Sequence, residues 1–190
     1  ITQYMKKLLL SILIFSSINF ETFSHVEHYT KYKYLEYELF RNNTLIGFHK
    51  FDFDRKGKDL TIDSEISFKI KKLGIDLYKY YAKGQEKYSD GVFSGFSSTT
   101  NQNKKQKYVN ISIDKRDKNL IIDGSSYKGK ADKDFIIGTW WNHEIVQKSA
   151  QISAVSGRII EQKVEFLGKE EITFGDKTFK TLKFNFSSTD

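Results

Sequence analysis

The residue types that could do chemistry gather in one short stretch of the chain, Gly138 to Glu144. It reads Gly-Thr-Trp-Trp-Asn-His-Glu and holds both tryptophans, followed at once by an amide, an imidazole and a carboxylate. His143 beside Glu144 suggests a general acid or base with an orienting carboxylate. Neighbouring residues of a strand point to opposite faces, so the two side chains share a site only if the chain turns here.

A nucleophile to match this pair is missing, because the sequence contains no cysteine and no Gly-x-Ser-x-Gly motif. We therefore favour a stretch without catalytic residues, in which Trp140, Trp141, Asn142 and His143 bind a ligand or close the fold. One tryptophan is expected to plug the end of the sheet, and the other to border an opening. The alternative is an enzyme that uses His143 and Glu144 as acid and base.

Three side chains elsewhere are further candidates for a ligand-binding surface. His49 shares a strand face with Phe51 and Phe53, where a half-buried imidazole with a backbone partner is the plainer interpretation. Tyr78 and Tyr80 belong to an aromatic strand, and tyrosine gives a cavity wall an apolar body with a polar tip.

The sequence offers few residues that could bind a metal ion. The four histidines are scattered and cysteine is absent, whereas a closed zinc site needs three or four convergent ligands. His25 and His28 could chelate copper if His25 became the mature N-terminus, but a tail without fixed structure is the simpler expectation there. We therefore expect neither a metal nor another cofactor.

Alternation of apolar and polar residues predicts that antiparallel strands position these side chains. The pattern is clearest from Leu60 to Ile70, where one face is apolar and the other polar. The absence of proline and an aromatic content of 15% also favour strands. Further predicted strands include residues 34–40, 45–54, 76–89, 92–100, 108–114, 119–124, 159–167, 170–174 and 179–186.

These strands define an all-β fold class. Short turns between them indicate a single antiparallel meander of about nine or ten strands, which must curl into a barrel or an open half-barrel. A short helical or irregular segment is expected near 139–150, because apolar residues there fit three- and four-residue spacing. Residues 25–190 are predicted to form one domain. The chain stops at Asp190 soon after a strand, which suggests that C-terminal strands are missing.

The N-terminal sequence predicts export. Two lysines follow Met5, and the apolar run from Leu8 to Ile18 is shorter than the roughly 20 residues of a membrane span. Residues 1–24 are expected to be an extension and signal peptide cleaved near Ser24. The mature protein would then be periplasmic or secreted, without a stable membrane span. Because cysteine is absent, a lipid-anchored lipoprotein is excluded.

The charge pattern bears on partners. A formal net charge of +7 permits attraction to anionic envelope surfaces, although the cations are interleaved with acids. The one short basic run, Lys104 to Lys107, lies in a turn-like segment, so we expect no nucleic-acid partner. The partner expected is a lipid or another apolar molecule of the envelope. The sequence does not indicate an oligomeric state.

The order of several short motifs resembles a family of exported all-β bacterial proteins, the domain of unknown function 6134 (DUF6134). An early strand carries Ile-Gly-Phe-His at 46–49, and a long aromatic strand carries Leu-Tyr-Lys-Tyr at 77–80. An acidic turn at 88–91, a Ser/Thr-rich strand at 97–101 and Thr-Trp-Trp-Asn at 139–142 follow in the same order.

This resemblance covers about residues 30–190 and implies fold and export but no activity, since none is established for the family. The family has proline where this chain has His143, and its late Trp-Tyr-Asp strand has no counterpart here. A looser likeness is to half-barrel carriers that ferry lipids or lipoproteins across the periplasm. Our leading hypothesis is a non-enzymatic protein that binds an apolar or amphipathic envelope ligand in a curved sheet. The alternatives are the acid/base enzyme and an envelope-assembly or scaffold protein with a filled core.

Overall fold

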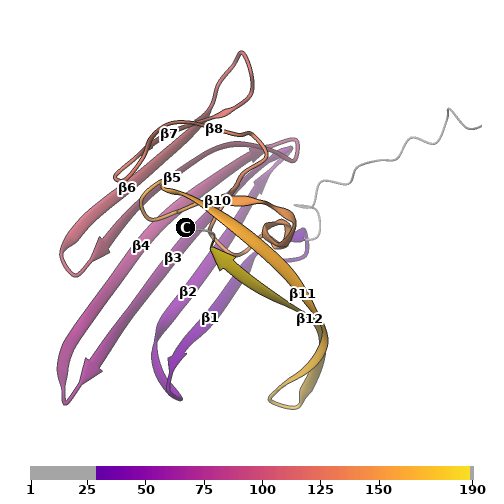
Figure 1. Ribbon diagram of the computed structural model, residues 1–190. Helices are drawn as coiled ribbons and strands as arrows, with labels where there is room; N and C mark the ends of the chain where they lie inside the picture. Colours follow the sequence, from indigo (N-terminus) through magenta and orange to yellow (C-terminus); the bar gives the residue numbers. More distant parts are fainter. Residues whose placement is uncertain (1–28, 189–190) are drawn as a thin grey trace, which may run out of the picture.

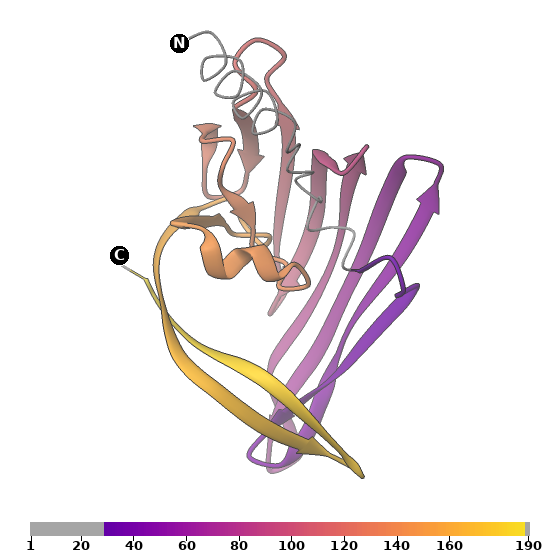
Figure 2. The same ribbon diagram turned by 90° about the vertical axis from the view of Figure 1, so that its right-hand side faces the viewer.

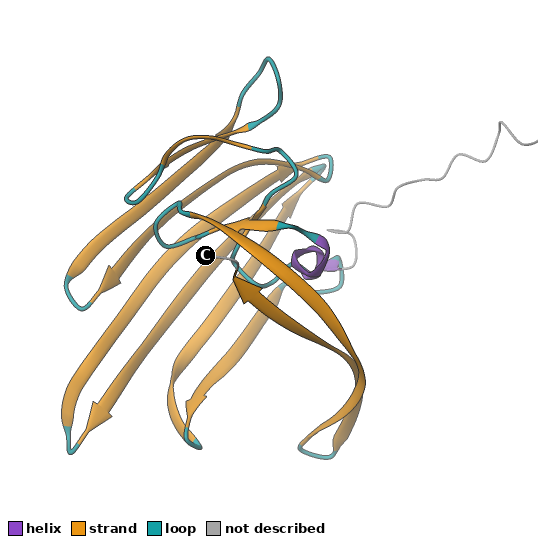
Figure 3. Cartoon of the chain, viewed as in Figure 1, coloured by secondary structure: helices purple, strands orange, loops and turns teal. Residues whose placement is uncertain are grey.

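The computed structural model describes residues 29–188, whose strands form two β-sheets and which include the short 3-10 helix η2 (His143–Gln147) (Figures 1 and 3). The predicted signal peptide, its cleavage site near Ser24 and the histidines at 25 and 28 lie outside the described residues. Within the described part of the chain, no helix has both the length and the apolar character needed to cross a membrane.

The first sheet is an eight-stranded antiparallel meander, as the alternation predicted. Each strand pairs with the next in sequence order, and β1 and β8 form its two edges, so the described strands do not close into a barrel. Its members are β1 (Tyr34–Arg41), β2 (Thr44–Lys56), β3 (Asp59–Lys72), β4 (Ile75–Ser89), β5 (Val92–Gln102), β6 (Lys105–Ile113), β7 (Leu120–Gly124) and β8 (Lys128–Ala131).

The second sheet corrects the prediction of a single meander. After β8 the chain leaves the first sheet, and β9 pairs in parallel with β10 because the 3-10 helix η2 (His143–Gln147) separates the two strands. Strands this short carry no readable alternation, so the sequence did not reveal them. The sheet order is β12-β11-β10-β9, with β9 (Ile136–Ile137), β10 (Ala150–Ile152), β11 (Ile159–Phe174) and β12 (Lys177–Ser188).

Gly168 is a bulge in β11 and not the turn that the sequence predicted. The pairing of β11 with β12 shifts between Phe166 and Gly168, which leaves Leu167 as the extra residue of the bulge. Gly168 has a φ of 122°, a backbone conformation that side chains disfavour, so glycine suits the irregular position. The two predicted strands at 159–167 and 170–174 are therefore one long strand.

The hydrophobic core has two parts. One joins β5, β6 and β7 of the meander to β9 and β10, and it includes Phe96, Val109, Ile122, Ile137 and Ile152. The other lies on β2, β3 and β4 and closes around Trp141. Both parts occupy one face of the meander, because side chains alternate between faces along a strand. We call this face the inner face.

The β11–β12 hairpin extends beyond the core. In Figure 2 it arcs away from the meander, and its tip lies at the same end of the molecule as the β1–β2 and β3–β4 turns. Large apolar side chains stay exposed along it, among them Phe166, Phe174 and Phe179. The inner face is therefore covered by η2 and the short strands near one end and left more open toward the other.

Candidate functional site

A buried carboxylate, that of Glu86, anchors the segment that the sequence singled out. Glu86 lies on the inner face of β4, and it is 4% exposed. Trp141 Nε1 donates a hydrogen bond to Glu86 Oε1 over 2.8 Å, and the Thr139 hydroxyl donates to the same oxygen. The Tyr88 hydroxyl donates to Oε2 over 2.9 Å. Three donors from two segments therefore satisfy one buried acid.

The protonation of this cluster follows from its burial. Burial raises the pKa of Glu86 above its ordinary value of 4.5, and the hydrogen bonds from Thr139, Trp141 and Tyr88 offset part of that rise. Burial, together with the negative charge of Glu86, also raises the pKa of Tyr88 well above its ordinary value. The phenol therefore stays protonated and available as a donor.

The two tryptophans point in different directions because the backbone turns between them. Trp140 has a φ of 68°, in the left-handed region, which is uncommon for a bulky residue. Trp141 is 3% exposed and packs edge-on against Phe53 and Tyr88. Trp140 is 56% exposed and contacts Phe186 of β12 with ring centroids 5.3 Å apart. One tryptophan is therefore buried and the other is exposed.

A cavity of about 220 Å³ lies between the inner face of the meander and the loop that carries Trp140. Its wall combines apolar side chains with a few hydroxyl groups. Members of that wall include His49, Ile66, Tyr80, Phe96, Trp140 and Val155, with Ser64, Ser98 and Thr139 as polar members. Of the residues that the sequence proposed for ligand binding, the cavity brings His49, Tyr80 and Trp140 together.

The titratable side chains that share the inner face with the cavity, His49 and Tyr80, are neutral at pH 7. The His49 ring lies 4.3 Å from the Phe51 ring, and burial lowers the pKa of His49 to about 4. Burial likewise raises the pKa of Tyr80. Lys83 also borders the cavity, but its Nζ lies 5.9 Å from the ring of Tyr81. Because side chains alternate along β4, Tyr81 and Lys83 lie on the face opposite to that of Tyr80. The wall therefore presents polar but uncharged groups to an occupant.

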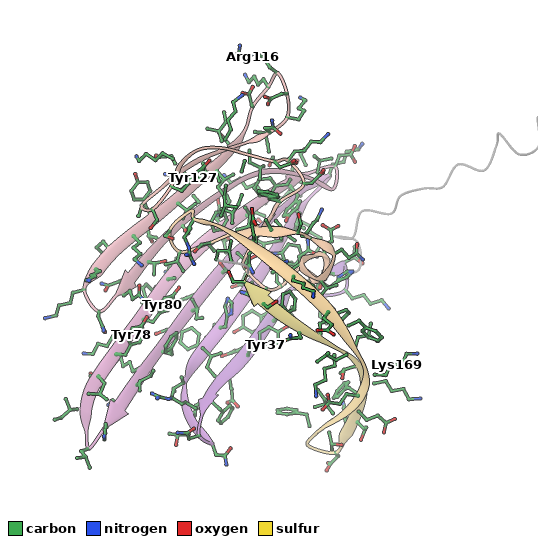
Figure 4. All side chains as sticks on the ribbon, in the orientation of Figure 1. Tyr37, Tyr78, Tyr80, Arg116, Tyr127 and Lys169 are labelled. Atoms are coloured by element: carbon green, nitrogen blue, oxygen red, sulfur yellow. The ribbon has the colours of Figure 1, made fainter. Side chains whose placement is uncertain are left out.

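Tyr78 lies further along the inner face than the cavity. Phe68 stacks on Tyr80 at 5.0 Å and on Tyr78 at 5.8 Å, which extends an aromatic row from the cavity along β3 and β4. Gln102 of β5 donates a hydrogen bond to the Tyr78 hydroxyl. Figure 4 shows Tyr78 and Tyr80 following one another along β4, with Tyr37 across the sheet on β1.

Asn142, His143 and Glu144 lie outside the described wall of the cavity. Asn142 is buried and caps η2, because its side chain accepts a hydrogen bond from Glu144 N over 3.0 Å. The exposed His143 has Nδ1 3.2 Å from the Tyr29 hydroxyl. The residues proposed from this stretch therefore have different positions: Asn142 caps η2, His143 is exposed, and of the two tryptophans only Trp140 borders the cavity.

Sequence reasoning missed Glu86, the residue that holds this loop. A signal was present, since Glu86 occupies an inward position on a strand whose neighbouring inward positions are Gly84 and Tyr88. A carboxylate at an inward-facing position of a strand indicates that a polar partner is buried with it. The described residues contain no group of three or more His, Asp or Glu side chains placed to hold a metal ion.

The fold and cavity define the class of protein: an open antiparallel β-meander accompanied by a second sheet, with a small cavity between the meander and the loops next to β9 and β10. The chain belongs to the DUF6134 family, a domain of unknown function, whose family model matches residues 37–190. The resemblance seen in the motif order is therefore confirmed. No curated protein and no solved structure matches the chain significantly.

Proposed function

We propose that this protein is exported and works in the periplasm as an open half-barrel that binds an apolar or amphipathic molecule of the envelope, without catalysing a reaction. The observation that carries the proposal is the cavity of about 220 Å³, with neutral His49 and Tyr80 in its wall and the exposed Trp140 at its border. Concave, mostly apolar sites with a few polar groups are the usual form of small-molecule sites.

The chemistry of the wall supports an apolar occupant. His49 and Tyr80 are both neutral, so neither attracts an ionised group, and the hydroxyls of Ser64 and Ser98 supply short-range polar contacts. Ser98 already donates to Ala154 O over 2.6 Å, which leaves its lone pairs as acceptors. A hydrocarbon chain fills such a space without leaving a charge unpaired.

The size of the cavity indicates what part of a ligand it holds. A volume of about 220 Å³ is below the roughly 300–1,000 Å³ of sites that enclose a whole drug-sized ligand. We therefore assign the cavity to one end of an acyl chain. The aromatic row of Phe68 and Tyr78 and the exposed apolar side chains of the β11–β12 hairpin extend the surface for the remainder.

Native mass spectrometry of the protein purified from its own cells tests this proposal. The expected result is an added mass that organic extraction identifies as a lipid. Trp140→Gly should retain less of it, because glycine accepts the left-handed backbone while removing the indole. Ile121→Ala, a change to an exposed apolar residue on the other face of the meander, serves as the control and should retain the lipid.

Two outcomes would overturn the proposal. A mass equal to that of the bare chain would favour the scaffold protein with a filled interior. An added mass that persists in Trp140→Gly would place the ligand elsewhere on the molecule.

A further inference from the structure

The end of the molecule opposite the β2–β3 and β4–β5 turns combines exposed apolar side chains with unpaired cations. It comprises the β1–β2, β3–β4 and β11–β12 turns, which lie at the same end of the molecule, the lower one in Figures 1 and 2, and we call it the hairpin end. Leu73 in the β3–β4 turn is 94% exposed, and Phe174 at the tip of β11 is 77% exposed. Leu45 and Ile75 are also exposed there.

Neither the backbone conformation nor the packing at position 73 favours leucine. Its φ is 51°, in the left-handed region, and the other positive φ angles in the described hairpin turns belong to Asn, Asp, Gly or Lys. Asn, Asp and Gly tolerate this conformation better than leucine does. A leucine that is disfavoured by its backbone and almost fully exposed contributes little to the folded chain. The exposed side chain is therefore available for contact with another surface.

The surface beside this turn is hollowed and basic. Two hollows of about 610 and 630 Å³ meet at Lys69 and Leu77, which border both. Among the described residues that line them, six are cationic and Asp76 is the acid; the six are Arg41, Lys69, Lys71, Lys72, Lys79 and Lys104.

Four of these six cations form no ion pair within the described residues. Asp76 is shared by Lys79, at 2.8 Å, and Lys71, at 3.7 Å. In the described part of the chain, Arg41, Lys69, Lys72 and Lys104 form no ion pair, although the charge of Lys69 helps to lower the pKa of Asp76. The hollows therefore combine apolar floors, such as Ile70 and Leu77, with an excess of positive charge.

We propose that the hairpin end docks on the surface of a lipid bilayer that contains anionic lipids. Exposed apolar side chains at turn tips enter the boundary between headgroups and acyl chains, and flanking lysines bind anionic headgroups while their stems stay among apolar groups. The charge of the hollows selects an anionic bilayer over a neutral one. This docking does not require the cavity beside Trp140 to be occupied.

A fluorescent probe at one position tests the docking of this end in particular. The chain contains no cysteine, so Ile75→Cys and Val92→Cys each give a single attachment site for an environment-sensitive dye. Val92 is also exposed but lies beside the β4–β5 turn at the opposite end. The probes are the full chains, mixed with phosphatidylcholine vesicles with or without phosphatidylglycerol.

The expected result is a blue shift of the dye at position 75 on vesicles with phosphatidylglycerol, which decreases in high salt and is absent at position 92. In the Ile75→Cys background, Leu73→Asn should raise the lipid concentration at half-binding about tenfold, through the lost burial of one leucine. Lys72→Gln should raise it about fivefold. Lys87→Gln, which changes an exposed lysine toward the other end of β4, should leave it unchanged.

Three outcomes would overturn the inference. The first is a dye at position 75 that stays in water while the chain sediments with vesicles, because another segment then makes the contact. The second is an equal response at positions 75 and 92. The third is self-association without vesicles that Leu73→Asn abolishes, which would make a second copy of this chain the occupant of the hairpin end.

Discussion

Trp141 donates from Nε1 to Oε1 of Glu86 over 2.8 Å, and this bond ties the loop after β9 to the C-terminal part of β4. The same oxygen accepts from Thr139, so two residues of the loop are fixed by one carboxylate. Trp140, between them, is left pointing outward at the border of the cavity. The position of the exposed tryptophan is thus set by a buried acid on another strand.

Removal of the Glu86 side chain should destabilise the protein strongly. Glu86→Ala leaves three buried donors without an acceptor, and we expect the free energy of unfolding to fall by about 3 kcal/mol or more. Glu86→Gln keeps an acceptor for Trp141 and should lose less. Urea unfolding followed by tryptophan fluorescence measures both. Equal losses in the two variants would contradict the assigned role of the hydrogen bonds.

The raised pKa of Glu86 predicts how this contribution varies with pH. The folded chain holds the proton more tightly than the unfolded chain, so the contribution to stability is full below the ordinary value of 4.5 and is lost as the pH rises through the raised pKa. Glu86→Gln cannot titrate. Its unfolding free energy relative to the wild type should therefore increase as the pH rises. A difference independent of pH would mean that folding does not shift the pKa of Glu86.

His49 should act in the opposite direction. Its pKa falls from 6.5 to about 4 on folding because of burial, so the unfolded chain binds the proton first as the pH decreases. The stability contribution is full above pH 6.5 and is lost as the pH falls toward 4. His49→Phe should remove this loss, so the free energy of unfolding should depend less on pH between 6.5 and about 4. An unchanged slope in the variant would show that the imidazole is hydrated in the folded protein.

Much of the fold was predictable because long strands repeat a two-residue alternation. Leu60 and Ile62 are buried where the pattern placed them, and the antiparallel meander follows from it. The second sheet was not predictable in the same way, since β9 and β10 are too short to show a period and their parallel pairing depends on η2.

The site was predictable only in part. Trp140 and His49 reach one cavity from distant parts of the chain, and their types alone suggested a wall for a ligand. The partner of Trp141 could not be found by local spacing, because Glu86 lies 55 residues away and is brought in by the packing of the loop on β4. A strand pattern assigns a face to each residue, but it does not say which loop covers that face.

Gln162 should be a second buried polar residue that the fold needs. Its Nε2 group donates to the carbonyls of Ile145 and Lys148, each at 2.9 Å, and so satisfies the end of η2. Gln162→Met should lower the free energy of unfolding by about 2 kcal/mol, since the Lys148 carbonyl loses its side-chain donor and the Ile145 carbonyl keeps only a long bond from Lys148 N. Gln151→Met is the matched control: Gln151 Nε2 donates to Gln162 Oε1, at 2.8 Å, so about 1 kcal/mol or less is expected. Equal losses would assign the effect to packing.

Leu73→Asn should make the protein more stable while it weakens membrane docking. Asparagine tolerates the left-handed conformation of this turn, and the leucine side chain is 94% exposed, so no packing is lost. We expect a gain of about 0.5–1 kcal/mol in the free energy of unfolding, measured in urea. A loss of similar size would show that Leu73 supports the fold, and the turn would then need no external partner. A residue that contacts another surface should give both results together: the substitution stabilises the folded chain and weakens vesicle binding. Stability alone would favour asparagine at this position.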